Sequence, residues 1–186
     1  SYLAAQDYRR AGETEKAVEE YRKAIANDPD SPYLLTELAG LYVREGKLED
    51  GLALALKAAE TAPSSETAFM MLGRIQAALG KDTEAVASFR RVLELDPKNE
   101  DAHMLLGTLY VKEGRLDDAM RSFDALKTMN PGNPVALYYK GRVFLDMRLY
   151  QAAETAYDEA LDLDPAFEPA LLVLGYIYEL TDRQAD

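Results

Sequence analysis

The sequence predicts an all-α protein built from a tandem helical repeat of 34 residues. A ladder of prolines has this spacing, at Pro29, Pro63, Pro97, Pro131 and Pro165. Two ladders of glycines share it, at Gly12, Gly46, Gly80 and Gly114 and at Gly73, Gly107, Gly141 and Gly175. Between these markers, apolar residues recur at steps of three and four, the period of an amphipathic helix. Three registers with one period and no insertions indicate a repeat protein.

The first helix of each repeat is expected to end at a glycine. The segments ETAFMMLGRIQAALG and EDAHMLLGTLYVKEG show the apolar period and stop at Gly80 and Gly114. An acidic, helix-favouring run follows, as in TEKAVEEYRKAI, DTEAVASFRRVL and LDDAMRSFDALK, and acids in a first turn complement the positive end of a helix. Each run then reaches a proline, which disfavours helical backbone in the residue before it. Each unit is therefore a helix, a glycine turn, a second helix and a proline break.

One such helical pair cannot bury its apolar face alone, so neighbouring pairs are expected to stack into an array. The expected repeats are residues 1–31, 32–65, 66–99, 100–133, 134–167 and a partial 168–186. We therefore expect residues 1–186 to form a single domain.

This pattern resembles the tetratricopeptide repeat (TPR) family, and the resemblance covers essentially the whole chain. The fourth repeat carries the family's positions as His103, Leu106, Gly107, Tyr110, Ala119, Phe123, Leu126 and Pro131. The resemblance implies a right-handed solenoid of about five and a half helix-turn-helix repeats. His103, the only histidine, falls where the family places a large packing residue.

Several positions depart from the family pattern. Gly51 and Ala55 stand in the second repeat where small and aromatic residues are usual, so the helix DGLALALKAAE is expected to pack less tightly. Gln76 replaces an aromatic residue of the third repeat, and Lys140 replaces a leucine of the fifth.

The last helix, expected over residues 168–181, has no second helix to pair with. Its residues include Leu171, Leu172, Leu174 and Ile177, whereas the ends of solenoids normally carry polar caps. The sequence therefore predicts a fragment of a longer array. The alternatives are that this helix acts as an improvised cap, or that it pairs with another copy.

Composition argues against most chemistry. The chain has no cysteine and one histidine, which excludes disulfides, thiolate ligands and a multi-histidine metal centre. A net charge of −12 speaks against nucleic acid, because phosphate contacts need a positive surface. No apolar run approaches the ~18–20 residues of a membrane span. We expect no catalytic residues, metal or cofactor, because acid pairs such as Asp117 and Asp118 fit helix first turns.

The resemblance implies that the first helices line a concave groove, and we expect a ligand to bind there. An apolar stripe of methionine and tyrosine is typical of a recognition surface, and Arg74 and Arg142, flanking Thr108, are candidates to hold a carboxylate. The candidate groove residues are Tyr33, Glu37, Met70, Arg74, Met104, Thr108, Tyr138, Tyr139, Arg142 and Tyr176, with Asp101 and Val111 on the same face. In the alternative interpretation, these tyrosines and methionines pack between neighbouring helices and the arginines bridge local acids.

The leading functional hypothesis is a protein–protein interaction scaffold. It would bind a peptide or a helical segment of a partner protein in the groove, as part of a larger complex. One alternative is a structural spacer, or a scaffold that self-associates through its convex face or through the terminal helix 168–181. Another is the targeting arm of a larger enzyme. The resemblance is to bacterial members in particular, for which the cytoplasm or the periplasm and envelope are the expected compartments.

Overall fold

The computed structural model describes residues 2–180, which form eleven α-helices and no strand. The helices are α1 (Tyr2–Arg10), α2 (Thr14–Asn27), α3 (Pro32–Arg44), α4 (Leu48–Thr61), α5 (Glu66–Ala78), α6 (Asp82–Leu95), α7 (Glu100–Lys112), α8 (Leu116–Met129), α9 (Pro134–Asp146), α10 (Tyr150–Leu163) and α11 (Glu168–Leu180). The all-α prediction of five and a half helical pairs is confirmed. The second helices end at the predicted proline breaks, and the first helices of the first four repeats end at the predicted glycine turns, whereas α9 ends before Arg148.

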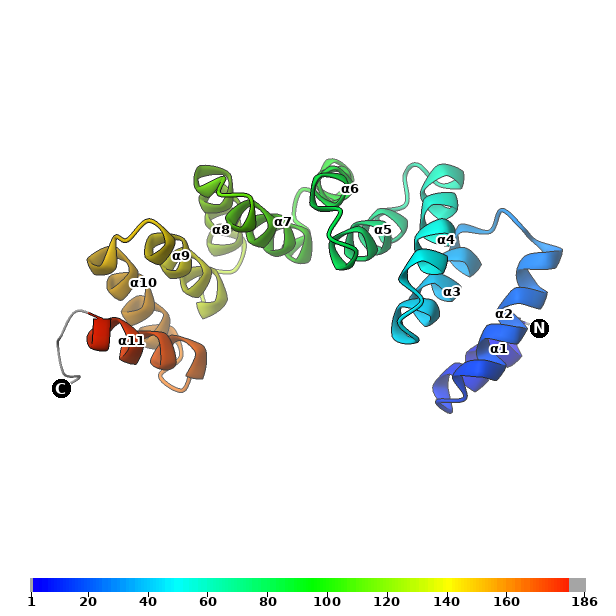
Figure 1. Cartoon of the computed structure of the whole chain (residues 1–186), viewed down its shortest axis with the longest axis horizontal. Coiled ribbons are helices and arrows are strands. Elements are labelled where there is room, and N and C mark those ends of the chain that lie inside the picture. The colour runs from blue at the N-terminus through cyan, green and yellow to red at the C-terminus, as the bar shows by residue number, and fades with distance from the viewer. Residues whose placement is uncertain (1, 181–186) are drawn as a thin grey trace. The chain divides into compact units, whose positions relative to one another are not determined.

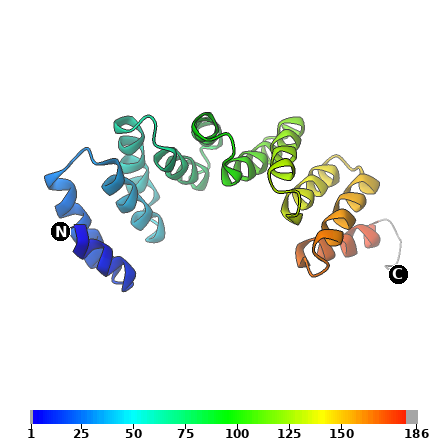
Figure 2. The ribbon, with the colours of Figure 1, turned by 180° about the vertical axis from the view of Figure 1, so that it is seen from behind.

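The helices divide into two compact units, Ser1–Pro97 with α1 to α6 and Lys98–Asp186 with α7 to α11. Within each unit, consecutive helices pack side by side, and so do the first helices of neighbouring repeats, α3 on α5 and α7 on α9 (Figures 1 and 2). Each unit has its own core, and Leu35 and Ile75 are buried in the first unit and Tyr157 and Ile177 in the second. The single domain over residues 1–186 stays a prediction, and the two units are described separately below.

A glycine below an aromatic ring brings the two helices of a repeat together. Gly107 of α7 lies under the ring of Phe123 of α8, and an added Cβ would come within 3.0 Å of that ring. Gly73 and Gly141 are covered in the same way by Phe89 and Tyr157. The resemblance implies a glycine and an aromatic residue at these two positions. In the structure, the aromatic ring packs directly on the glycine.

In the second repeat, small residues on α4 take the place of the aromatic ring that packs between the paired helices elsewhere. Gly51 of α4 is buried, and a Cβ added to it would lie 3.3 Å from the carbonyl oxygen of Ala39 in α3. Ala55, which replaces the aromatic residue, is fully buried. The expectation that this helix packs less tightly is therefore wrong, because the absence of a large ring lets the two backbones approach.

The departure at Lys140 has a local explanation. Its Nζ lies 2.6 Å from Oδ1 of Asp124, so the lysine joins α9 to α8 through an ion pair at the surface. A long side chain with a charged tip can cover the helix contact with its stem and still keep its ammonium in water.

The turns between paired helices need a left-handed residue. Gly114 has φ 72°, and the N–H of the following Arg115 donates to the carbonyl of Tyr110 at 2.8 Å, closing the end of α7. The fifth repeat has Arg148 at the equivalent position with φ 57°, and the N–H of Leu149 donates to the carbonyl of Phe144 at 2.8 Å. The backbone is thus the same in both turns, although only one of them has the residue that this conformation favours.

Replacing Arg148 with glycine is therefore expected to stabilise the second unit by about 1 kcal/mol. Relief of the left-handed strain gives roughly 1–2 kcal/mol, and the greater freedom of glycine in the unfolded chain removes about 0.5–1 kcal/mol of it. Urea unfolding followed by circular dichroism measures the difference. The reverse change, Gly114→Arg, should destabilise by a similar amount, and equal stabilities for Arg148→Gly and the parent chain would contradict the account.

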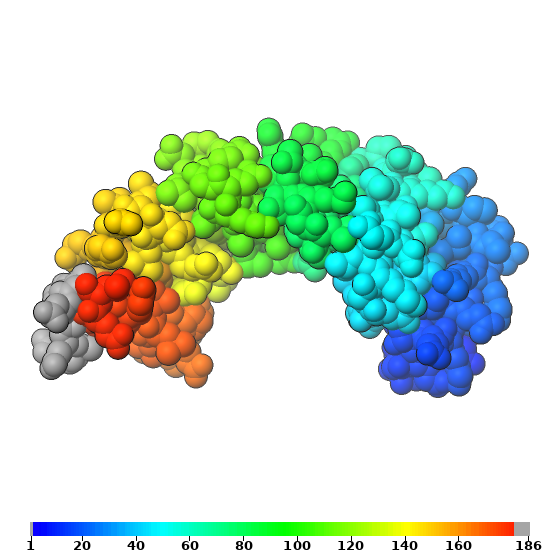
Figure 3. Space-filling view, viewed as in Figure 1, coloured from blue at the N-terminus to red at the C-terminus, as the bar shows by residue number. Residues whose placement is uncertain are grey.

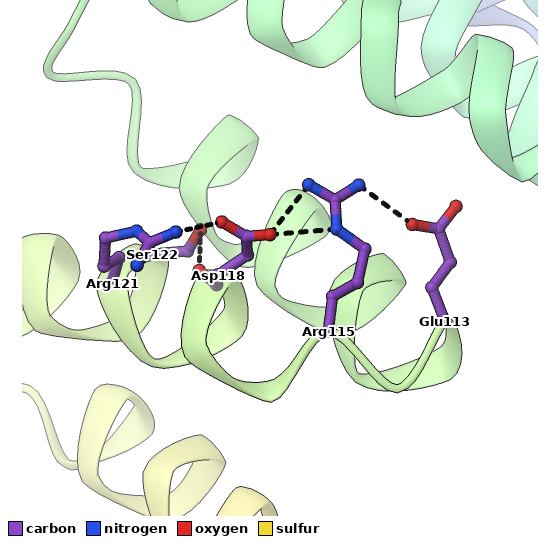
Figure 4. Close-up of polar contacts among 5 residues, drawn as sticks. All are labelled: Glu113, Arg115, Asp118, Arg121 and Ser122. Carbon is purple, nitrogen blue, oxygen red and sulfur yellow. Dashed lines mark hydrogen bonds and ion pairs between the residues drawn. The ribbon is translucent and has the colours of Figure 1, made fainter.

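The turn before α8 is held by Arg115 (Figure 4). Its Nε donates to Oδ2 of Asp118 at 2.9 Å, its Nη1 donates to Oε2 of Glu113 at 3.1 Å, and its guanidinium lies 4.3 Å from the ring centre of Tyr110. The hydrogen bond from Arg115 lowers the pKa of the Asp118 carboxyl, and a hydrogen bond from Arg121 adds to this effect.

Replacing Arg115 with glutamine should move the pKa of Asp118 back up towards its ordinary value. A carboxyl whose pKa falls on folding stabilises the folded state above its unfolded pKa, and that contribution disappears as pH falls through the lower, folded pKa. The stability difference between the parent and Arg115→Gln should therefore be present at pH 7 and shrink below the ordinary pKa of an aspartate. A carboxyl NMR titration and urea unfolding at several pH values measure both effects. Arg121→Gln should shift the same pKa less.

Candidate functional site

The ten predicted groove residues all lie on first helices of the repeats. Four belong to the first unit, on α3 and α5, and six belong to the second, on α7, α9 and α11. The structure brings three of the six together at one pocket and places a fourth at a neighbouring pocket. The predicted pairing of Arg74 with Arg142 joins residues of different units and stays a prediction.

A pocket of about 170 Å³ lies between α7 and α9. Its lining, which we call the basic pocket, is Thr108, Val111, Lys112, Tyr139 and Arg142. Both cations of this lining are exposed, whereas the hydroxyl of Thr108 donates to the carbonyl of Met104 at 2.9 Å. The pocket thus combines two positive charges with the apolar surface of a valine and a tyrosine.

Aromatic packing fixes the position of Tyr139 in this wall. Its ring stacks on Phe123 of α8, with ring centres 5.1 Å apart and an interplanar angle of 12°. Tyr138 contacts the rings of Tyr139, Tyr157 and Phe167 at 5.3, 5.9 and 5.8 Å between centres. The packing alternative therefore describes Tyr138, which is half-buried in this cluster, while Tyr139 presents part of its ring to the pocket.

A buried phenol lies behind this part of α9. Tyr157 is fully buried, and its hydroxyl has no hydrogen-bond partner within residues 2–180. Burial raises the pKa of Tyr157, nearby Tyr138 and Asp146 raise it further, and the positive charge of Arg142 opposes them. Tyr157 thus stays uncharged at neutral pH and adds no negative charge behind the basic pocket.

A second pocket, of about 190 Å³, lies at the other end of the same two helices. Its lining, which we call the acidic pocket, is Glu100, Asp101, Met104, Leu126, Asn130, Asn133, Val135 and Ala136. The carboxylates belong to the first turn of α7, and the side chain of Asn133 accepts from the N–H of Val135 at 3.0 Å as the cap of α9. Met104, a predicted groove residue, is half-buried in this lining, and its neighbour His103 is half-buried on α7.

In the first unit, the predicted residues Tyr33 and Glu37 belong to a polar network that links α3 to α1 and α2. Gln6 donates to the hydroxyl of Tyr33 at 3.0 Å, and one carboxylate oxygen of Glu37 lies 3.1 Å from Nη1 of Arg9 and accepts from the hydroxyl of Tyr21 at 3.1 Å. Burial, followed by the charge of Glu37, raises the pKa of Tyr21. Glu37 thus pairs with Nη1 of Arg9 and with the hydroxyl of Tyr21, whereas the buried Nε of Arg9 has no hydrogen-bond partner within residues 2–180. Met70 and Arg74 follow on α5, the first half-buried and the second exposed.

The last helix, α11, lies at the surface of the second unit, where it is drawn in red (Figure 3), and several of its apolar side chains are exposed. Leu174 and Ile177 are buried in the core of the second unit, whereas Leu172 is 75% exposed and Tyr176 is 56% exposed. Tyr176, the tenth predicted residue, thus lies on α11 apart from the linings of both pockets. Residue 181, the expected end of this helix, lies outside the described residues.

Several residues that line the pockets were not among the predicted site residues. Lys112 lines the basic pocket directly after Val111, and the repeat register would have placed it beside the groove. The amides Asn130 and Asn133 line the acidic pocket from the break between α8 and α9, a segment that periodicity describes only as a break.

Within residues 2–180, no group of three or more histidine, cysteine, aspartate or glutamate side chains is placed to hold a metal ion. None of the helices in the same part of the chain has the length and apolarity that crossing a bilayer requires.

In a comparison with known protein families, the family described as "Tetratricopeptide repeat" matches this chain at residues 2–67, 41–100, 70–134 and 138–186. No curated protein matches the chain. Among solved structures, MamA is 22% identical, with a TM-score of 0.82, 87% of this chain and 94% of that chain covered. YrrB, described as a TPR protein with an unusual peptide-binding site, is 25% identical, with a TM-score of 0.80 and coverage of 91% and 87%. A tetratricopeptide repeat protein from Parabacteroides merdae is 19% identical, with a TM-score of 0.88 and coverage of 96% and 71%.

Proposed function

The chain belongs to the tetratricopeptide repeat family, and from this premise we propose that it is a protein–protein interaction scaffold that holds a segment of a partner protein against its first helices. The observation that carries the proposal is the convergence of Thr108, Tyr139 and Arg142 at one pocket between α7 and α9. These residues come from neighbouring repeats, so the pocket is a property of the stacked array. The peptide-binding site named for YrrB supports the same mode of action.

The basic pocket suits a carboxylate that carries an apolar stem. A guanidinium offers a planar pair of donors to a carboxylate, and an ammonium adds a second charge. Val111 and Tyr139 supply apolar surface beside these charges. In a chain of net charge −12, this local positive patch selects the acidic side chain of a partner and does not attract anions at long range.

The test is quantitative capture of bound proteins by the immobilised chain. Arg142→Glu should reduce the specifically captured set by at least about tenfold, or ~1.4 kcal/mol, because it replaces attraction by repulsion at the pocket. Arg90→Glu is the matched control, since Arg90 is an exposed arginine of α6 outside both pockets. Equal capture by Arg142→Glu and Arg90→Glu would defeat the proposed groove.

A second candidate, self-association through α11, is favoured by the exposed face of that helix. The equivalents of Gly175 in three repeats are each covered by an aromatic ring, whereas no described atom would lie within 4 Å of a Cβ added to Gly175. Exposed apolar surface of this kind marks an interaction site. Sedimentation equilibrium should then show a concentration-dependent dimer that Leu172→Glu abolishes. A monomer at every concentration would exclude this candidate.

Scaffolds of this family are typically non-enzymatic, and the proposal gives these residues no catalytic step. The targeting-arm alternative is compatible with the same groove and stays a prediction.

A further inference from the structure

Two pockets of opposite charge lie along one pair of helices. The acidic pocket has the carboxylates of Glu100 and Asp101, and the basic pocket has the cations of Lys112 and Arg142. Both are lined by α7 and α9, which are in contact. The charge of this surface therefore changes from negative to positive along the helix pair. A site for one carboxylate would need only the positive end.

The distance between the pockets follows from helix geometry. α7 lines the acidic pocket with residues 100, 101 and 104 and the basic pocket with residues 108, 111 and 112. The middles of these two sets are about eight residues apart, which is about 12 Å at 1.5 Å per helical residue. In an extended peptide, residues four apart lie about 13 Å apart and point to the same side. An extended segment thus places two side chains over the two pockets.

The linings suit long side chains with charged tips. Met104, Leu126, Val135 and Ala136 give the acidic pocket an apolar wall, against which a lysine or arginine stem packs while its cation reaches the carboxylates. Its volume of about 190 Å³ and the 170 Å³ of the basic pocket are each of single side-chain size. Each pocket repels the ligand that the other attracts, so a segment with charges of one sign meets repulsion at one end.

We propose that the α7–α9 surface binds an extended segment of a partner protein that carries one basic and one acidic side chain four residues apart. The basic side chain occupies the acidic pocket and the acidic side chain occupies the basic pocket. This inference rests on the proposed function, since it names the chemistry of the segment that the scaffold holds. It adds a requirement, because the segment needs both charges and their spacing.

The probe is a set of acetylated and amidated pentapeptides titrated into the ¹⁵N-labelled full chain. The mixed probe is Lys-Ser-Val-Ser-Glu, and the controls replace its ends to give two lysines or two glutamates. The mixed probe should shift amide signals at both pockets, and each same-sign probe should bind at least about fivefold more weakly. Equal binding of the three probes would overturn the proposal. A longer mixed probe with its two charges seven residues apart tests the helical alternative, and binding of this probe alone would replace the extended segment by a helical one.

Charge exchange on the protein gives the sharper test. Lys112→Glu with Arg142→Glu changes the net charge by −4, and Glu100→Lys with Asp101→Lys changes it by +4. Each double variant should lose the mixed probe, because one pocket then repels it. The quadruple variant keeps the net charge at −12 and should recover binding, with the peptide running in the opposite direction. Loss of binding in the quadruple variant overturns the proposal, provided that circular dichroism shows the parent helix content. That check is needed because lysines in the first turn of α7 oppose its helix dipole.

The outcomes separate this inference from the function on which it rests. A mixed probe that shifts both pockets in the parent and in both double variants leaves the peptide scaffold standing and removes the charge requirement. If no probe shifts α7 or α9 although Arg142→Glu abolishes protein capture, the extended two-charge segment is wrong and the scaffold stands. If Arg142→Glu also leaves capture unchanged, both fail.

Discussion

Replacing Phe123 with alanine should lower the free energy of unfolding of the second unit by about 3–5 kcal/mol. The ring is fully buried and covers Gly107, so its removal leaves a cavity between α7 and α8 that the two helices cannot close without moving. It also removes the ring on which Tyr139 stacks, and with it the support of one wall of the basic pocket. Urea unfolding measures the first effect, and the amide shifts of α9 report the second.

The partner of this ring makes the prediction specific. Gly107→Ala alone should cost about 1–3 kcal/mol, because the new Cβ would come within 3.0 Å of the Phe123 ring and force the helices apart. In the Phe123→Ala background the same methyl fills vacated space, and the higher helix propensity of alanine should then gain about 0.5–1 kcal/mol. The sign of the glycine substitution should therefore reverse between the two backgrounds. If the effects of Gly107→Ala and Phe123→Ala on the free energy of unfolding simply add, the ring does not pack directly on the glycine.

Gly175 is the matched control. It has the same place in α11, but no described atom would lie within 4 Å of an added Cβ. Gly175→Ala should thus stabilise the chain by about 0.5–1 kcal/mol through helix propensity alone. A destabilisation there would mean that a second helix covers this glycine in solution, which is the outcome expected if α11 is buried between two copies.

The repeat period predicted most of the fold because it reports backbone requirements. The glycines spaced like Gly114 mark the places where the chain needs a left-handed residue, and the prolines spaced like Pro131 mark the places where a helix must end. Arg148, which lies 34 residues after Gly114, was not among the predicted turn residues, yet its backbone is left-handed as well. The close packing at Gly51 could not be predicted from the sequence. Where an aromatic ring is absent, either a cavity remains or the two helices move closer, and the sequence does not decide between these outcomes.

The candidate site was predicted in part for a different reason. Register assigns a face of a helix, and this sufficed to group Thr108, Tyr139 and Arg142. It does not say which side chains on that face pair with neighbours, and so it could not separate Tyr138, held in an aromatic cluster, from Tyr139. The ligand-binding roles themselves stay predictions, since they depend on a partner.

Gln76 shows the same limit inside the core. The family pattern has an aromatic residue at this position, and the sequence alone marks the glutamine as a departure. In the structure Gln76 is buried, and its Oε1 accepts a hydrogen bond of 2.6 Å from the hydroxyl of Ser88, also buried, in the paired helix α6. Gln76 and Ser88 thus form one hydrogen-bonded pair. They lie twelve residues apart, and the repeat period does not say which residues are partners.

Breaking this pair from one side should be costly, and removing both sides should not. Gln76→Leu leaves the Ser88 hydroxyl buried without an acceptor, and Ser88→Ala leaves the Gln76 amide unsatisfied, so each should cost about 1–3 kcal/mol. The double variant Gln76→Leu with Ser88→Ala removes both polar groups and should lie within about 1 kcal/mol of the parent, or above it. Urea unfolding of the four proteins gives the coupling energy, and single costs that simply add would show that the hydrogen bond does not link α5 to α6 in solution. A large coupling would instead mean that the third repeat uses a buried polar contact where its neighbours use an aromatic ring, so its register is held by partner matching as well as by shape.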